Sequence, residues 1–234
     1  MNISEKLTTI AKNQEKVYEA GKKSQYDFFW NDYQENGNRK NYSDGFAFWS
    51  KKIFDPKYDM VDMINADRMF YGFNSPKGLV DLVDLLEEKG KTLDFSKCTR
   101  LYYTFEQAYI SRIGTFDMSS ASDTTYGALN CTQLVTIEKL VISEKTKLDN
   151  YTFPFYSGAK LANINCVEGE ICTNIRIANC PLTKASIENV VNALSNTTSG
   201  FTCTFNKNAK ESAFTTDEWN SLIATKSNWT FSLA

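Results

Sequence analysis

The chain has 234 residues, a formal net charge of −2 and no histidine, and 42% of its residues are hydrophobic. This length allows one extended domain or two small ones with a substantial core. The near-neutral charge argues against a protein that binds nucleic acid, which needs a basic face. The sequence contains no run of about 18 apolar residues, so we expect no membrane insertion.

Residues 1–25 have the pattern of an amphipathic helix. Apolar residues recur at alternating spacings of four and three, which is a heptad stripe, and a polar glutamine interrupts it. The stripe consists of Ile3, Leu7, Ile10, Gln14 and Val17. One interpretation is a stalk that forms a coiled coil and makes the protein a homo-oligomer. The alternative is a helix that packs on its own domain. No apolar stretch typical of a signal peptide follows Lys6, which predicts synthesis in the cytoplasm without a signal peptide, so that the protein would leave the cell only by lysis or within a larger assembly.

Residues 26–92 form a segment that we interpret as an N-terminal cap. Its first part, 26–58, is dense in aromatic residues, which bury large areas and could build a small core. A contact surface for sugars or proteins is the alternative. Residues 66–73 are similar in sequence to Tyr103-Thr104-Phe105, which predicts that they form a first, irregular repeat.

A helix is predicted between Ser75-Pro76 and Gly90. Its apolar face would carry Leu79, Leu82, Val83 and Leu86. A short strand is expected to follow at 93–95.

Residues 93–182 contain a repeated phrase in which a branched apolar residue and two polar or small residues precede isoleucine. The phrases end at Ile113, Ile137 and Ile164, which are 24 and 27 residues apart. Self-similarity at about 20–30 residues is typical of a solenoid, in which neighbouring repeats stack to bury their apolar sides. Each phrase predicts a short strand, and Ile171, Ile175 and Ile177 would complete the array.

Residues 183–234 change in character and predict helix, strand, helix, strand. Thr183 is a good N-cap for the first helix, and Thr215 with Glu218 is a capping box for the second. Alternating residues predict strands at 201–205 and 229–233. We expect these strands to be parallel and to extend the sheet of the repeats, as a terminal cap that covers their core.

The six cysteines favour a reduced chain over a metal site. Without histidine or a Cys-x-x-Cys pair, neither a Cys/His nor a four-Cys zinc site is expected. We therefore predict no metal and no cofactor. The cysteines are interpreted as small buried residues, with a disulfide framework as the alternative. They are Cys98, Cys131, Cys166, Cys172, Cys180 and Cys203.

The repeated phrase resembles the irregular leucine-rich repeats of the BspA type. Five stretches near the two ends of the chain are similar to a phage and prophage group found in Firmicutes, namely 4–11, 16–23, 26–30, 181–187 and 224–230. The resemblance implies an α/β leucine-rich-repeat solenoid with short parallel strands. An N-terminal helix, with the potential to form a coiled coil, and a C-terminal αβαβ cap would flank the repeats.

The resemblance also implies a non-catalytic structural or recognition protein, located in the virion as a tail or fibre component. Its partners would be further copies of itself, other virion proteins, or a bacterial envelope protein or glycan. Candidate surface contacts are Tyr102, Tyr103, Arg112 and Lys139, although each of them also fits an ordinary solvated position on a strand face.

Three other functions were weighed. A bacterial surface adhesin with the same repeats would need a signal peptide or an anchor, and neither is recognisable. A cytoplasmic phage factor that binds a host protein stays open. A glycan hydrolase would need two paired carboxylates. The available carboxylates form no recognisable pair, so we predict that the chain is not an enzyme. They are Asp94, Glu106, Asp117, Glu138, Glu168 and Glu170.

Overall fold

The computed structural model describes most of the chain from residue 60 onward and four residues before it. The described residues are Thr9, 12–14, 60–74, 78–122, Thr124, 131–143, Thr146, 160–169 and 171–234. The chain divides into two units, Met1–Arg39 and Lys40–Ala234. In the first unit, Thr9 and residues 12–14 are helical and exposed. Gln14 is therefore helical, as predicted. The rest of the stripe (Ile3, Leu7, Ile10 and Val17) and the aromatic segment 26–58 lie outside the described residues.

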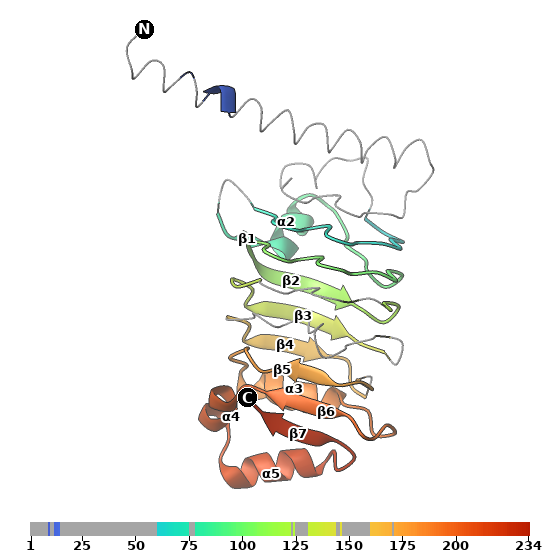
Figure 1. Cartoon of the computed structure of the whole chain (residues 1–234), viewed down its shortest axis with the longest axis vertical. Coiled ribbons are helices and arrows are strands. Elements are labelled where there is room, and N and C mark those ends of the chain that lie inside the picture. Colours follow the sequence, from blue (N-terminus) through green and yellow to red (C-terminus); the bar gives the residue numbers. More distant parts are fainter. Residues whose placement is uncertain are drawn as a thin grey trace. The chain divides into compact units, whose positions relative to one another are not determined.

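The second unit is a mixed α/β structure with parallel sheets and few helices. Its first sheet has the order β1-β2-β3-β4 and its second sheet the order β5-β6-β7, and all of these pairings are parallel. Figure 1 shows the strands following one another in sequence order. The first sheet consists of β1 (Val80–Asp81), β2 (Ile110–Asp117), β3 (Thr136–Val141) and β4 (Asn163–Cys166). The second consists of β5 (Ile175–Ile177), β6 (Thr202–Phe205) and β7 (Thr230–Leu233). The helices are α2 (Leu82–Glu88), α3 (Lys184–Ala193), α4 (Lys207–Ala213) and α5 (Thr216–Ala224).

The core of the first sheet is built from the repeated phrase. Ile113 pairs in register with Ile137, and Ile137 pairs with Ile164, so the three isoleucines form one buried column. The apolar residues three positions earlier in each phrase are buried as well. The prediction that each phrase forms a strand stacked on the next is confirmed for these three strands.

Residues 66–73 follow the same path as residues 101–108. Backbone hydrogen bonds join them at every second residue, from Arg68 N to Tyr102 O (2.7 Å) and from Phe70 N to Thr104 O (2.8 Å). The rings of Phe70 and Phe105 stack with centroids 5.1 Å apart. The predicted similarity between residues 66–73 and the segment around 103–105 is therefore confirmed. The matching segment begins at residue 101, two residues earlier than predicted.

The predicted strand at 93–95 is wrong, because Asp94 makes a turn there. Its carboxylate accepts a hydrogen bond from Ser96 N (2.8 Å), and Asp117 does the same for Ser119 N after β2. These local bonds bend the chain and compete with strand pairing. A serine hydroxyl then ties each turn to the preceding one, as Ser120 Oγ donates to Ser96 O at 2.6 Å.

Helix α2 begins later than predicted. Residues 79–81 are not helical, and Leu79 is exposed rather than part of the apolar face. Asp81 is the N-cap, since its carboxylate accepts hydrogen bonds from Val83 N and Asp84 N. The predicted end is confirmed, because Gly90 follows the helix with φ +59°.

The C-terminal region confirms both predicted caps and adds one helix. Thr183 caps α3, and Thr215 with Glu218 forms the capping box of α5. The short helix α4 was not predicted. Strands β6 and β7 are parallel, as expected.

The C-terminal strands β6 and β7 continue in parallel from β5, the last predicted rung of the repeats, but they do not extend the first sheet as expected. Side chains of α3 take up the free edge of β4, where Ile164 N donates to Ser186 Oγ (3.1 Å) and Cys166 N donates to Asn189 Oδ1. The helix therefore occupies the edge that a fifth strand would need. A second sheet begins at β5 instead.

A buried lysine closes the end of α3. The Lys226 amine donates to Asn192 O (3.2 Å), Leu194 O (2.6 Å) and Asn196 Oδ1 (2.8 Å). Burial lowers its pKa. Trp229 Nε1 adds a bond to Ser195 O at 2.8 Å. The Lys226 amine thereby satisfies Asn192 O and Leu194 O at the end of α3, where carbonyl groups lack an intrahelical partner, and Trp229 binds the residue that follows the C-cap.

All six cysteines are free thiols. Cys98, Cys131, Cys180 and Cys203 are buried, whereas the other two are half-buried. Burial raises the pKa of Cys131 to about 12, so its thiol stays protonated and unreactive near neutral pH. The interpretation as small, mostly buried residues is confirmed, and the disulfide alternative is not.

Candidate functional site

The predicted contact residues lie in two places. Arg112 is on β2 and Lys139 is on β3, where Lys139 is exposed and pairs with Thr115. Tyr102 and Tyr103 lie in the turn that precedes β2, with their ring centroids 4.1 Å apart. The structure therefore brings Arg112 and Lys139 onto neighbouring strands and leaves the tyrosines in the turn.

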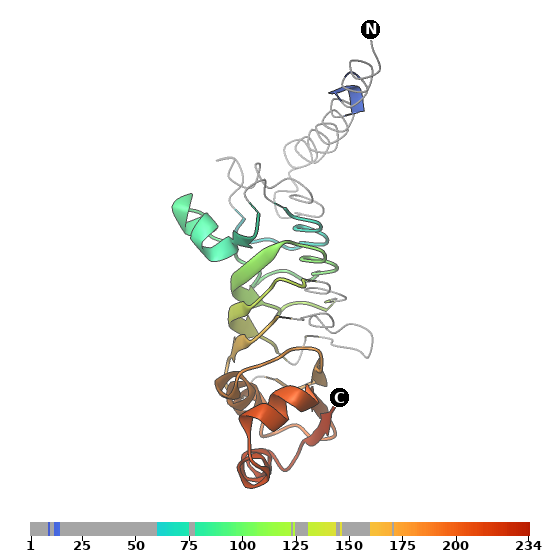
Figure 2. The same ribbon diagram turned by 90° about the vertical axis from the view of Figure 1, so that its left-hand side faces the viewer.

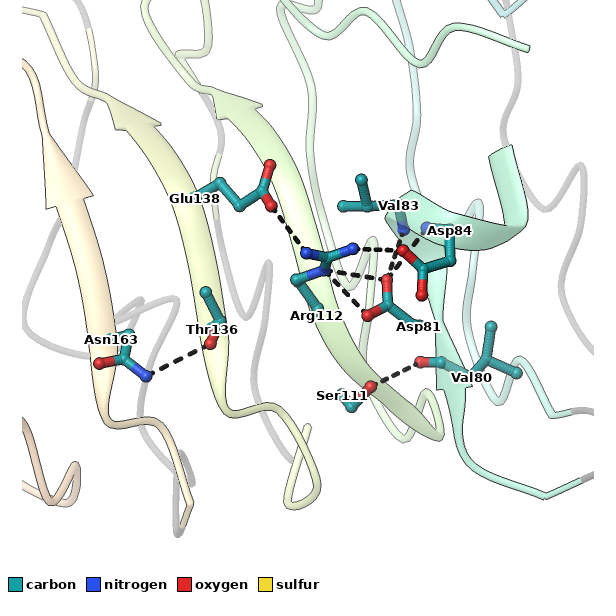
Figure 3. Close-up of polar contacts among 9 residues, drawn as sticks. All are labelled: Val80, Asp81, Val83, Asp84, Ser111, Arg112, Thr136, Glu138 and Asn163. Atoms are coloured by element: carbon teal, nitrogen blue, oxygen red, sulfur yellow. Dashed lines mark hydrogen bonds and ion pairs between the residues drawn. The ribbon is translucent and has the colours of Figure 1, made fainter. Parts of the chain in front are cut away.

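Arg112 is the centre of a network of three carboxylates (Figure 3). Its Nε lies 2.9 Å from Asp81 Oδ2, its Nη2 lies 2.5 Å from Asp84 Oδ1, and its Nη1 lies 3.1 Å from Glu138 Oε1. We call these four residues the Arg112 network. It connects β1, α2, β2 and β3 through side chains alone.

The register of the sheet explains why the network forms. Asp81 pairs with Arg112, and Arg112 pairs with Thr136, two residues before Glu138. Asp84 is added by α2, which starts immediately after β1 and stands out from the side of the unit that carries this sheet (Figure 2). Asp81 thus has two functions, since it caps α2 and binds Arg112.

The network carries more negative than positive charge. One guanidinium faces three carboxylates, and the hydrogen bond that Arg112 donates to Asp81 is the main cause that raises the pKa of Arg112. The side chains of Asp84 and Glu138 are 69% and 44% exposed. Solvent and salt therefore screen these pairs, so each contributes little to stability and all remain accessible to a partner.

Small polar side chains cover the strand face beside the network. Asn163 Nδ2 lies 3.4 Å from Thr136 Oγ1, and Asn165 Nδ2 donates to Glu138 O at 3.1 Å. In the second sheet, the hydroxyls of Thr204 and Ser232 are 2.6 Å apart. Both sheets therefore present polar groups that are joined from strand to strand.

The turn with the two tyrosines is held by a buried carboxylate. Asp67 accepts hydrogen bonds from Tyr102 N (3.0 Å) and Arg100 Nε (2.8 Å). Tyr103 has φ +53°, a left-handed conformation that costs a residue with a side chain about 1 kcal/mol or more. The matching position one segment earlier, Arg68, has the same conformation. The turn geometry is therefore a property of both stacked segments.

Three of the carboxylates weighed for glycan hydrolysis make structural contacts. Asp94 and Asp117 hold turns, and Glu138 binds Arg112. Glu170 lies outside the described residues. Sequence reasoning selected Arg112 but not Asp81 and Asp84. Asp81 and Asp84 could be identified only from the strand register, which pairs Asp81 with Arg112 and cannot be read from the sequence alone.

A shallow, open depression of about 370 Å³ lies beside α4 and is lined partly by Asn179, Asn206 and Asn208. The Asn206 side chain is already engaged, because Oδ1 caps α4 and Nδ2 donates to Ala178 O at 2.7 Å.

In the part of the chain that the structure describes, no group of three or more Cys, Asp or Glu side chains is arranged to hold a metal ion.

Two further findings concern the chain as a whole. Among the described helices, none combines the length and the hydropathy needed to cross a bilayer. Comparisons of the chain with protein-family models, with curated proteins and with solved structures gave no match.

Proposed function

We propose that the chain is a BspA-type leucine-rich-repeat solenoid of the phage and prophage group, located in the virion as a tail or fibre component. In this proposal it is non-catalytic and presents the outer face of its repeats to a partner protein or an envelope glycan. The observation that carries the proposal is the column of Ile113, Ile137 and Ile164 on successive parallel strands.

The arrangement of side chains around that column supports a display function. The apolar residues of each phrase face inward, whereas Arg112, Thr136 and Asn163 occupy one row on the outer face. A repeat scaffold offers such rows as an extended surface, on which the residues that vary between repeats provide specificity. The Arg112 network is the most structured polar feature described on this surface.

The proposed N-terminal stalk would make the protein a homo-oligomer. Gln14 is helical and exposed, which agrees with a polar position on a heptad stripe. Size-exclusion chromatography with light scattering tests the stalk on the full chain. We expect an oligomer at micromolar concentration, and a monomer under these conditions would contradict this part of the proposal.

Virion membership is tested by mass spectrometry of purified phage particles from a strain that encodes the chain. We expect its peptides in the particles at a level comparable with known minor tail proteins. Their presence only in the cell lysate would favour a cytoplasmic phage factor. Their presence on the surface of the host cell would favour an adhesin.

Catalysis is tested separately by incubating the full chain with purified host cell wall. We expect no release of reducing sugar. Release that is abolished in Glu138→Gln, and retained in a matched variant such as Glu211→Gln, would replace the proposed display function with glycan hydrolysis.

A further inference from the structure

Three large apolar side chains are exposed at the starts of consecutive strands. Leu79, Tyr109 and Val135 are 47%, 41% and 36% exposed. Val80 N donates to Tyr109 O (3.1 Å), which places Leu79 beside Tyr109, and Val135 N donates to Ser111 O (2.8 Å), which places Val135 on the next segment opposite Ser111, two residues beyond Tyr109. We call them the apolar row. Single exposed apolar residues are common, but several side by side are typical of a contact surface.

The apolar row lies next to the Arg112 network. Leu79 precedes Asp81 by two residues, and Tyr109 and Val135 precede Arg112 and Glu138 by three. At about 3.3 Å per residue of strand, the two rows are roughly 7–10 Å apart. A single extended peptide segment can reach both rows.

The charges on this surface favour a cationic partner. The network has three carboxylates and one guanidinium, and α2 adds Glu87 and Glu88, of which Glu88 pairs with Lys89 at 2.7 Å. Lys139 is a further cation on β3. The carboxylates of Asp84 and Glu138 are drawn toward the same guanidinium and repel each other. Arg112 occupies the space between them (Figure 3), so a further cation that binds their exposed oxygens from outside would reduce the excess negative charge, whereas an anionic partner would increase it.

We propose that the apolar row and the Arg112 network together bind a basic polypeptide segment of a partner protein. An apolar side chain of that segment covers the row, and a lysine or arginine beside it binds Asp84 and Glu138. The proposal deepens the proposed display function and rests on it, by assigning the surface and the chemical class of the partner.

The test measures binding of three short synthetic peptides to the full chain by fluorescence anisotropy. The first alternates leucine and lysine, the second leucine and glutamate, and the third serine and lysine. We expect the leucine–lysine peptide to bind, the leucine–glutamate peptide not to bind, and the serine–lysine peptide to bind about tenfold more weakly, because it lacks apolar area. Binding should weaken with added salt.

Two variants assign the binding to this surface. Asp84→Asn combined with Glu138→Gln should weaken the leucine–lysine peptide about tenfold, and Tyr109→Ser should weaken it by a similar factor. Matched controls change the same chemistry elsewhere. Glu188→Gln with Glu211→Gln removes two charges from α3 and α4, and Leu233→Ser removes a side chain that is 40% exposed on β7. Both controls should bind like the wild type. Circular dichroism and the melting temperature check that every variant is folded.

Several outcomes would overturn the proposal. These are no binding of the leucine–lysine peptide, equal binding of the leucine–glutamate peptide, or equal losses in the surface variants and their controls. Self-association that Tyr109→Ser abolishes, without peptide binding, would assign the surface to a second copy of the chain instead. The particle experiment does not use this surface, so the display function and the peptide site can fail independently.

Discussion

From β1 to β4, contacts between side chains of successive segments hold the structure together, whereas from β5 to β7 three helices with their own caps add to such contacts. In the first region the Phe105 ring contacts the rings of Phe70, Phe95 and Phe116, which belong to different segments. In the second region the Trp219 ring likewise contacts the rings of Phe205, Phe214 and Phe231, and in addition α3, α4 and α5 each begin with a capping side chain.

The difference indicates where each region obtains its stability. A segment of the first sheet cannot bury its apolar side without its neighbours, so we expect damage to spread along the stack. The helices of the second region satisfy their own first-turn N–H groups, so much of their stability is local. The effect of losing one contact should therefore spread further in the first region than in the second.

The largest effect is expected from Phe105→Ala in the first region. Phe105 is fully buried and joins three other rings, so its loss should lower the free energy of unfolding by about 3–5 kcal/mol. The measurement is urea unfolding followed by circular dichroism. The comparison is Phe231→Ala on β7, which is half-buried and should cost only about 1–2 kcal/mol. Equal losses would remove the proposed difference between the two regions.

The next largest effect is expected from Lys226→Met in the second region. This change removes three donors from a buried site, so two carbonyl groups and the Asn196 amide oxygen lose their partner. We expect a loss of about 2–3 kcal/mol, measured by the same unfolding experiment. Lys207→Met is the control, because the Lys207 amine is exposed and its ion pair with Glu211 is long at 3.9 Å. This variant should change the free energy of unfolding by less than about 0.5 kcal/mol. If Lys226→Met unfolds with the same free energy as the wild type, the hydrogen bonds of Lys226 do not stabilise the end of α3.

The sequence predicted much of the second region because its signals are local. Thr183 precedes α3, and Thr215 with Glu218 precedes α5, so each cap is visible within four residues. Helix α4 was missed because it has seven residues and buries only Ala209. Its N-cap, Asn206, was present in the sequence but lacked an apolar pattern behind it.

The first region was predicted only where its residues repeat. The isoleucine column follows from spacing, but the turn after Asp94 and the start of α2 depend on two aspartates whose carboxylates accept hydrogen bonds from nearby backbone N–H groups. Aspartate in a sequence does not reveal which of several local hydrogen bonds it will make. The Arg112 network depends on register between segments about 25–30 residues apart, so Asp81 and Asp84 were not identified in advance.

A smaller effect is expected from Arg112→Gln, which tests whether the network ties the first sheet together. Without the guanidinium, Asp81, Asp84 and Glu138 lose their shared counter-charge and repel one another. We expect a loss of stability that is larger in low salt than in high salt, measured by thermal unfolding at both. Arg112→Gln combined with Glu138→Gln should recover part of the loss. A loss that is independent of salt would point to packing of the arginine stem instead.

The smallest effect is expected from Glu218→Gln, which tests a local cap of the second region. The hydrogen bond from Lys184, followed by those from Thr215, lowers the pKa of Glu218 to about 2 from its ordinary value of 4.5. A carboxylate whose pKa is lower in the folded state stabilises the fold above its unfolded pKa, and this stabilisation is lost as the pH falls. Wild-type stability should therefore decline between about pH 4.5 and about pH 2 more steeply than that of the variant. The measurement is the melting temperature across this range, with Glu211→Gln as the control, because Glu211 lies on the neighbouring helix without a capping function. Identical pH profiles for the wild type and Glu218→Gln would mean that the capping box and the Lys184 pair do not stabilise α5 in solution. The second region would then depend on its neighbours as much as the first.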